Sequence, residues 1–316
     1  MDQNLYSIPM IISWLKLYNL SFPTKSKQRK HFLKFWLFYL ALALRNWPKR
    51  KRIVFPEQKV ESAMWVALNA WLQFQLRFIS ARDWIRCPVV VQVGGDYSKE
   101  NNFKSILSSP SDKECVNKLA LKYAKSFRGY QSKHYENWLL KYIYMLRSAE
   151  LMAGKKLITD ELTVLEIGPG VGPLMALALH KGVHEFVSYD TVEFQFIQRF
   201  AINSLEIDSS KVRYVSINDH REKSQFLPPK SPYVIFGLWS LTEIQEKGRE
   251  DYLALIEQAA VTIIASNKTI EGLDNFSYLE SLARNTNKTC QFLEFKEILG
   301  LGLLRYQESH RLYCLK

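Results

Sequence analysis

A glycine-rich segment near the middle of the chain carries residue types that suit ligand binding. Residues 164–173 are Val-Leu-Glu-Ile-Gly-Pro-Gly-Val-Gly-Pro, with glycines at 168, 170 and 172. The apolar run predicts a buried strand that breaks into a tight turn, and residues 174–181 predict a helix. Glycine allows backbone angles that a Cβ forbids, and it lets a ligand approach the main chain closely. Glu166 adds a carboxylate two residues before the first glycine.

A second carboxylate follows at the spacing that a nucleotide-like ligand requires. Residues 185–190 predict the next strand, which ends in Asp190. An acid about 20 residues beyond such a turn is placed to accept hydrogen bonds from ribose hydroxyls. The glycine spacing differs from the Gly-x-Gly-x-x-Gly of dinucleotide-binding turns, and Glu166 would repel a diphosphate. The pattern therefore disfavours a nicotinamide cofactor and favours a ligand that carries an ammonium and a sulfonium.

The Glu-x-Gly-x-Gly-x-Gly pattern resembles the first motif of class I S-adenosylmethionine-dependent methyltransferases. The resemblance implies S-adenosylmethionine as the cofactor, with its ribose held by Asp190. The residues that it places against the methionine portion are Glu166, Gly168, Pro169, Gly170 and Gly172. The alternative is an ordinary strand, turn and helix without a ligand.

The same resemblance places the adenine near the end of the third strand. Asn218 and Asp219 occupy that position in this sequence and would lie near the adenine amine. The alternative for Asp219 is a simple turn acid, because Asp is common in turns.

Two further segments are similar to a more specific group, a family assigned to sugar O-methylation in surface-polysaccharide gene sets. They are Tyr189-Asp-Thr-Val-Glu193, followed by a helical pattern, and Ser240-Leu-Thr-Glu243 at the end of the fourth strand. The resemblance covers roughly residues 115–316. One departure is that Tyr189 and Thr191 flank the acid where the family has a more apolar Leu-Pro setting. The resemblance implies methylation of a sugar hydroxyl on a surface glycan or on its lipid-linked or nucleotide-linked precursor.

Methyl transfer to a hydroxyl needs alignment of the reacting atoms and a positioned base. Glu243 is the first candidate for that base, although Ser-x-x-Glu is also a helix capping box that would begin at Ser240. His220, after the third strand, titrates near neutrality and is the second candidate. His134, in the preceding helical region, is the third. Trp239 could stack on a sugar ring, or it could belong to the core.

From residue 162 onward, strand patterns alternate with helical patterns. The predicted strands are 163–167, 186–190, 212–217, 233–238, 261–265, 290–294 and 311–315. Helical patterns between the first five predict a parallel sheet with helices on both faces. No long helix separates the last two, so they are predicted as an antiparallel hairpin at the sheet edge. The predicted fold class is α/β, a Rossmann-like class I methyltransferase sheet of seven mostly parallel strands, with the last strand antiparallel, preceded by a helical N-terminal region.

Three regions are predicted along the chain of 316 residues. Residues 1–58 form a basic, aromatic-rich helical segment, residues 59–158 a helical cap, and residues 159–316 the cofactor-binding domain. Within the cap, we expect a short strand at 87–93 and helix over 114–153, with a break near Gly129.

The net charge of +12 is concentrated at the N-terminus. Residues 1–60 hold 12 of the 43 Lys and Arg residues and only two acids. The uncharged run 35–44 would span ~15 Å as a helix, which is too short to cross a membrane. Residues 8–52 instead suit helices lying in an anionic membrane surface. The alternatives are a core helix docked on the body, and nucleic-acid binding, which the absence of a recognisable binding module disfavours.

Cysteine usage indicates a reducing compartment. The four cysteines lack Cys-x-x-Cys spacing and lack a His at ligand spacing, so no zinc site and no other metal cluster is predicted. We expect a cytoplasmic protein, peripheral at the inner face of the membrane, that acts as a sugar O-methyltransferase. The rival hypothesis is a non-catalytic module of the same fold that binds a membrane or a protein partner through its N-terminal helices.

Overall fold

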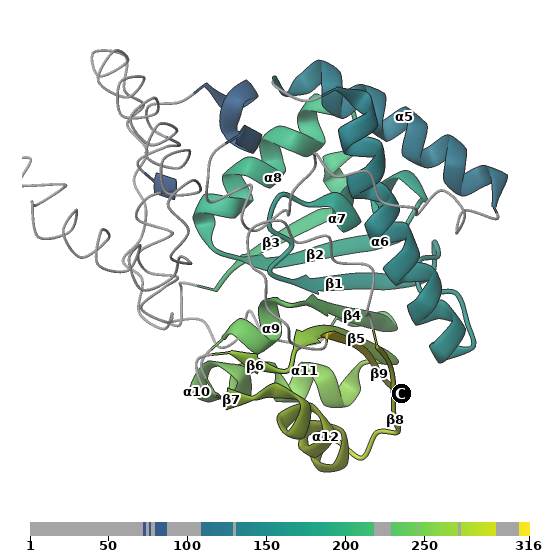
Figure 1. Cartoon of the computed structure of the whole chain (residues 1–316), viewed down its shortest axis with the longest axis vertical. Coiled ribbons are helices and arrows are strands. Elements are labelled where there is room, and N and C mark those ends of the chain that lie inside the picture. The colour runs from purple at the N-terminus through teal and green to yellow at the C-terminus, as the bar shows by residue number, and fades with distance from the viewer. Residues whose placement is uncertain are drawn as a thin grey trace, which may run out of the picture.

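The computed structural model describes residues 72, 73, 76, 80–86, 109–128, 131–217, 229–244, 246–270, 273–294 and 310–316 (Figure 1). The predicted membrane-surface segment 8–52 and the predicted strand 87–93 lie outside these residues. So do three predicted site residues, Asn218, Asp219 and His220.

Within the described residues, seven strands form one sheet. They are β1 Thr163–Ile167, β2 Glu185–Asp190, β3 Val212–Ser216, β4 Tyr233–Leu238, β5 Val261–Asn267, β8 Cys290–Glu294 and β9 His310–Leu315. Their order is β3-β2-β1-β4-β5-β9-β8, and β9 runs antiparallel to both of its neighbours. The predicted α/β sheet of seven mostly parallel strands, with the last strand antiparallel, is therefore confirmed. The predicted antiparallel hairpin at the sheet edge is also confirmed: β9 pairs with β8, and β8 is the edge strand.

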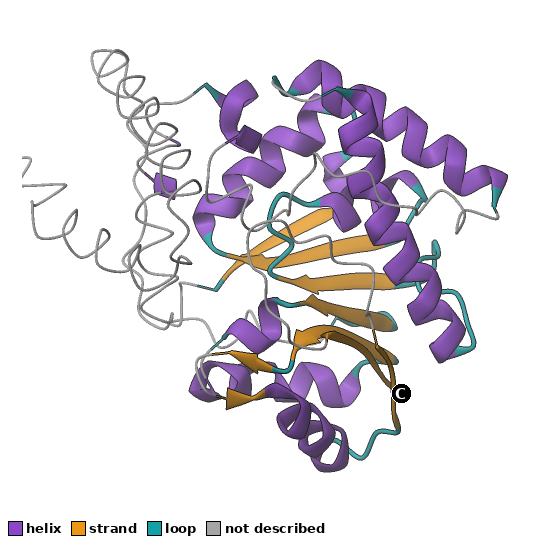
Figure 2. Cartoon of the chain, viewed as in Figure 1, coloured by secondary structure: helices purple, strands orange, loops and turns teal. Residues whose placement is uncertain are grey.

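Helices cover both faces of the sheet (Figures 1 and 2). One face is covered by α5 Pro110–Ser126, α6 Ser132–Ala153, α7 Pro173–His180 and α8 Val192–Ser204. The other is covered by α11 Leu253–Gln258 and α12 Asn275–Asn285. The short helices α9 Ser240–Glu243 and α10 Glu246–Arg249 and a small hairpin, β6 Thr269–Ile270 and β7 Leu273–Asp274, complete the connections.

The two covered faces explain why the central strands are apolar along their whole length. Strand side chains alternate between faces, and a strand buried on both sides has no polar face. On β1, Val164 packs with the α5–α8 core, and Leu165 and Ile167 pack with the core under α11 and α12. Glu166 shares its face with Val164, so its carboxylate lies on the α5–α8 side.

Aromatic side chains join the two long helices that precede β1. Tyr123 of α5 stacks on Tyr135 of α6 with ring centroids 5.4 Å apart, and it meets Trp138 edge-on at 5.3 Å. Phe127 continues the cluster to Phe200 on α8, at 5.3 Å. Such pairs add to the free energy of apolar burial. They fix α6 across the face of the sheet that carries Glu166.

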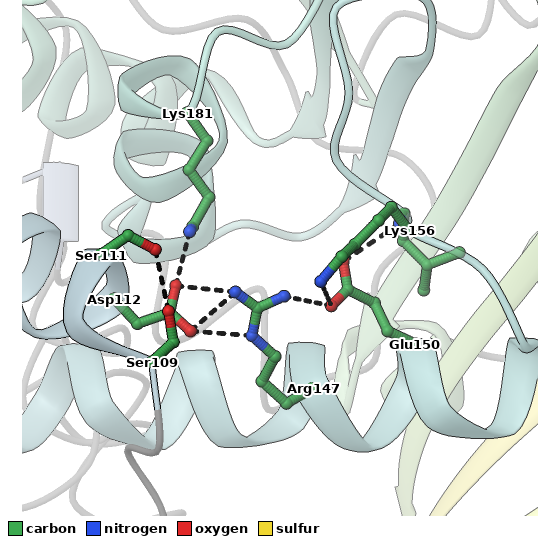
Figure 3. A network of polar contacts seen from close by, with 8 residues as sticks. Ser109, Ser111, Asp112, Arg147, Glu150, Lys156 and Lys181 are labelled. Carbon is green, nitrogen blue, oxygen red and sulfur yellow. Dashed lines mark hydrogen bonds and ion pairs between the residues drawn. The ribbon is translucent and has the colours of Figure 1, made fainter.

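A network of ion pairs fastens α5, α6 and the end of α7 to one another (Figure 3). Asp112 accepts two hydrogen bonds of 2.8 Å from Arg147 and one of 2.6 Å from Lys181. Arg147 also pairs with Glu150, which accepts the backbone N–H of Leu157 at 3.2 Å. Burial would raise the pKa of Asp112, but the hydrogen bonds from Lys181 and Arg147 outweigh it and hold that pKa below its usual range.

Cys115, Cys290 and Cys314 are free thiols, and the last two lie on the paired strands β8 and β9. Among the helices of the described segments, none combines the length and the apolar character that a membrane crossing would need.

Candidate functional site

The glycine turn between β1 and α7 has the geometry that its sequence predicts. Gly168, Gly170 and Gly172 have φ values of 65°, 60° and 78°, in the left-handed region that favours glycine. A Cβ on Gly168 would lie 2.4 Å from the Cβ of Ser240, so the turn also depends on close approach. Pro173 begins α7, where its missing N–H costs nothing.

The end of β4 is tied directly to this turn. Ser240 donates its hydroxyl hydrogen to the carbonyl oxygen of Ile167, the last residue of β1. Trp239, not Ser240, is the N-cap of α9, so the helix does not begin where the alternative reading of Ser240–Glu243 as a capping box would place it. Glu243 is half-buried at the end of α9. Its role as a base stays a prediction.

Asp190 lies beneath the turn, at the end of β2. Its carboxylate accepts the backbone N–H of Gly170 at 3.0 Å, that of Thr191 at 2.8 Å and the side-chain amide of Gln198 at 2.8 Å. The sequence correctly brings Asp190 to the glycine turn. The structure gives it a second task, because its carboxylate also fixes the shape of that turn. Its contact with a ribose stays a prediction.

Gln198 is a site residue that the sequence analysis missed. Its amide donates to Asp190 and to the carbonyl oxygen of Gly170 at 2.9 Å, and its oxygen accepts from Ser188 at 2.7 Å. The side chain is completely buried. Its signal in the sequence is a polar residue on the inward face of a helix, among Phe194, Ile197 and Ala201.

Glu166 stands out among the buried acids of the site. It exposes 1 % of its surface, and its Oε2 meets no hydrogen-bond donor in the part of the chain that the structure describes. Burial, and then the negative charge of Asp190, raise its pKa well above the ordinary value. A buried carboxylate oxygen without a donor is costly unless a ligand completes it. An ammonium group is the ligand chemistry that this oxygen fits.

Helix α6 contributes Lys141 and Tyr142 to the same region. Burial, and then the charge of Glu166, raise the pKa of Tyr142, which keeps its hydroxyl protonated. The half-buried Lys141 holds its Nζ 4.5 Å from the ring centroid of Trp239, and burial lowers its pKa to about 8. The sequence analysis missed Lys141, because nothing in its local pattern separates it from a solvated lysine on an amphipathic helix.

His134 takes part in a backbone contact at the start of α6, and its role as a base stays a prediction. It is the third residue of α6, and its Nδ1 accepts the backbone N–H of Gln131 at 3.2 Å in a capping box at the start of that helix. Across the described segments, no three His, Cys, Asp or Glu side chains gather as a metal-binding group.

Comparisons with known proteins give no family assignment. No protein-family profile and no curated protein matches the sequence. Solved structures give weak matches. A putative RNA methyltransferase from Pyrococcus horikoshii is 14 % identical, with 66 % of this chain and 98 % of that chain covered, at a TM-score of 0.42. An O-methyltransferase family protein from Burkholderia thailandensis is 9 % identical, with 81 % and 73 % covered, at 0.40. The fold assignment rests on the strand order and directions of the sheet.

Proposed function

We propose that this protein is an S-adenosylmethionine-dependent O-methyltransferase. The observation that carries the proposal is the buried Oε2 of Glu166, which has no donor among the described residues and lies just before the glycine turn. A ligand with an ammonium group would supply the missing hydrogen bond, and its charge would return Glu166 to the ionised state. The residues present therefore fit this cofactor.

Each part of the site has a task in this proposal. Glu166 binds the ammonium, and the turn from Gly168 to Gly172 leaves room for the methionine portion against the backbone. Asp190 holds the turn and binds the ribose, and the proposal assigns Asn218 and Asp219 to the adenine. When bound, the cofactor supplies an electrophilic methyl group on a positively charged sulfur. The protein aligns that group with the acceptor and receives the acceptor's proton.

We further propose that the acceptor is a sugar hydroxyl of a surface glycan or of its precursor. Support comes from the resemblance around Tyr189–Glu193 and Ser240–Glu243. Glu243 and His220 remain candidates for the base. The basic, aromatic segment 8–52 would hold a cytoplasmic enzyme near the membrane where lipid-linked precursors are made.

Isothermal titration calorimetry with S-adenosylhomocysteine tests the cofactor. We expect binding to the wild type and loss of binding in Asp190→Ala. Glu185→Ala is the matched control, because Glu185 lies at the opposite end of the same strand in a surface ion pair with Arg213. Its affinity should equal that of the wild type. A folded wild type that binds neither S-adenosylhomocysteine nor S-adenosylmethionine would overturn the proposal.

Functional assays of variants and of a truncated chain separate the rival hypothesis of a non-catalytic module. Such a module would keep its cellular function in Glu243→Ala and His220→Ala, and would lose it when residues 1–52 are deleted. An enzyme of the proposed kind would lose activity in the variant of whichever residue is the base.

A further inference from the structure

The order of the strands shows on which side of the glycine turn an acceptor must lie. Strand β1, which carries Glu166 and leads into the turn, has β2 on one side and β4 on the other. Asp190, the proposed ribose contact, ends β2. In the proposed function the ribose therefore lies toward β2, and the side of the turn that remains for the acceptor is the end of β4. Open α/β sheets bind their ligands at this edge.

Trp239 occupies the end of β4 in a strained conformation. Its φ of 71° is rare for a residue with a large side chain. Its backbone N–H donates to the carbonyl oxygen of Ala265 at 2.8 Å, which holds it in place. Its indole Nε1 is buried and has no acceptor within the described ranges. Strain of this kind persists where the surroundings enforce it, and such sites are often functional.

Lys141 of helix α6 contacts the end of β4. Its Nζ lies 4.5 Å from the ring centroid of Trp239 and 5.7 Å from that of Tyr142. No carboxylate of the described chain forms an ion pair with it. The titratable groups nearby are Tyr142, on the same helix, and Glu166, which acts on Tyr142 from β1. A lysine that is withdrawn from water and has no acid beside it is suited to lose its proton.

We propose that Lys141 is the catalytic base, and that α6 and the end of β4 form the acceptor site with Trp239 as its floor. This inference rests on the proposed methyltransferase function. As the acceptor oxygen bonds to the methyl carbon, the methyl–sulfur bond breaks and sulfur keeps the electron pair. The hydroxyl proton passes to the neutral Nζ of Lys141. The resulting ammonium is stabilised against the face of the indole ring.

The protonation state of Lys141 agrees with this role. Burial lowers its pKa to about 8, so a substantial fraction of the amine is neutral at the pH of a cell. An ordinary lysine, with a pKa near 10.4, would be almost entirely charged there. Tyr142 does not compete, because its own pKa is raised by burial and by Glu166.

Transfer of a tritiated methyl group from S-adenosylmethionine to a panel of free and nucleotide-linked hexoses tests the base. Lys141→Met should lower kcat by about 10²–10⁴-fold and remove the rise of kcat/KM with pH. The dissociation constant for S-adenosylhomocysteine should stay within about twofold. Lys118→Met, on the exposed surface of α5, should change neither quantity. If Glu243→Gln abolishes transfer and Lys141→Met does not, Glu243 is the base and the inference is wrong.

Competitive acetylation with acetic anhydride tests the amine without an acceptor. Labelling of Lys141, followed by peptide mass spectrometry across a pH series, should give a midpoint near its pKa of about 8. A Lys141 midpoint near the 10.4 of an ordinary lysine would overturn the inference even if no hexose in the panel is methylated. Failure of the wild type to bind S-adenosylhomocysteine would instead overturn the proposed function, so the two failures are distinguishable.

Discussion

Asp112 and Glu166 are carboxylates that each expose 1 % of their surface, on the same side of the sheet, in opposite surroundings. Asp112 accepts hydrogen bonds from Arg147 and Lys181, and these outweigh the effect of burial and lower its pKa. At Glu166, burial and the charge of Asp190 both raise the pKa, and Oε2 finds no donor in the described chain.

The difference separates an acid whose partners the fold supplies from one whose Oε2 lacks a donor in the described chain and that we propose as a ligand contact. A buried carboxylate needs compensating partners, because removing its charge from water is unfavourable. At Asp112 the chain provides those partners from α6 and from the residue that follows α7. At Glu166 it provides another acid instead, Asp190. This contrast predicts that substitutions at the two positions will have opposite effects on stability and on binding.

The largest expected effect is loss of stability in Asp112→Ala. The change leaves Arg147 and Lys181 without their shared partner, and we expect the free energy of unfolding to fall by about 4 kcal/mol. Because the folded pKa is lowered, this stabilisation is present above the unfolded pKa of about 3.9 and disappears as pH falls through the folded value. Urea unfolding at pH 7 and in acid measures both effects. Affinity for S-adenosylhomocysteine should be unchanged in the folded variant.

Gly168→Ala tests whether the glycine turn depends on the absence of a side chain at this position. The new Cβ would require an unfavourable φ and would collide with Ser240, so we expect a loss of about 3 kcal/mol in stability. Gly182→Ala is the control, because its φ of 84° is equally unfavourable but nothing lies within 4 Å of the added Cβ. It should cost only about 1 kcal/mol. Equal losses in thermal unfolding would show that close approach to Ser240 contributes nothing.

Glu166→Gln should lower affinity without lowering stability, which is the opposite of the effect expected for Asp112→Ala. The variant removes the charge that an ammonium would pair with, and we expect affinity for S-adenosylhomocysteine to fall by about 2 kcal/mol, roughly 30-fold. The ligand-free protein should become slightly more stable at neutral pH. Calorimetry and thermal unfolding on the same samples measure the two effects. A variant that loses stability and keeps its affinity would mean that Glu166 is structural.

The smallest expected effect is a proton released on binding. Since the folded pKa of Glu166 is raised, stability of the ligand-free protein should decrease as pH rises from about 4.3 toward that folded value. An ammonium ligand favours the ionised acid, so affinity should rise with pH over the same window. Titrations in buffers of different ionisation enthalpy would detect release of up to one proton. The difference between buffers should shrink in Glu166→Gln by the amount due to this residue.

The elements were more predictable than the contacts between them. The bounds of β1, β4 and β8 agree residue for residue with the predicted 163–167, 233–238 and 290–294. Their apolar runs end at clear turn signals, which are local properties of the sequence. The interior place of β9 was not predicted, because pairing between distant segments has no local signature.

The site residues that are close together in the sequence were likewise predictable, and those contributed by separate helices were not. Glu166, the glycines and Asp190 belong to one short segment and its neighbouring strand, so the spacing alone brings them together. Lys141 and Gln198 reach the turn region from helices on either side of it in the sequence. Their surroundings depend on how α6 and α8 pack on the sheet, which the pattern of either helix does not specify.

The position of β9 has a consequence for the order in which the chain can fold during synthesis. This strand leaves the ribosome after the other six strands of the described sheet, yet it separates β5 from β8 and pairs with both. Until it is made, β5 presents an unpaired and apolar edge to its surroundings. We therefore expect nascent chains that stop before residue 310 to be open to aggregation and to chaperone binding, and completion of the sheet to wait for the release of the last strand.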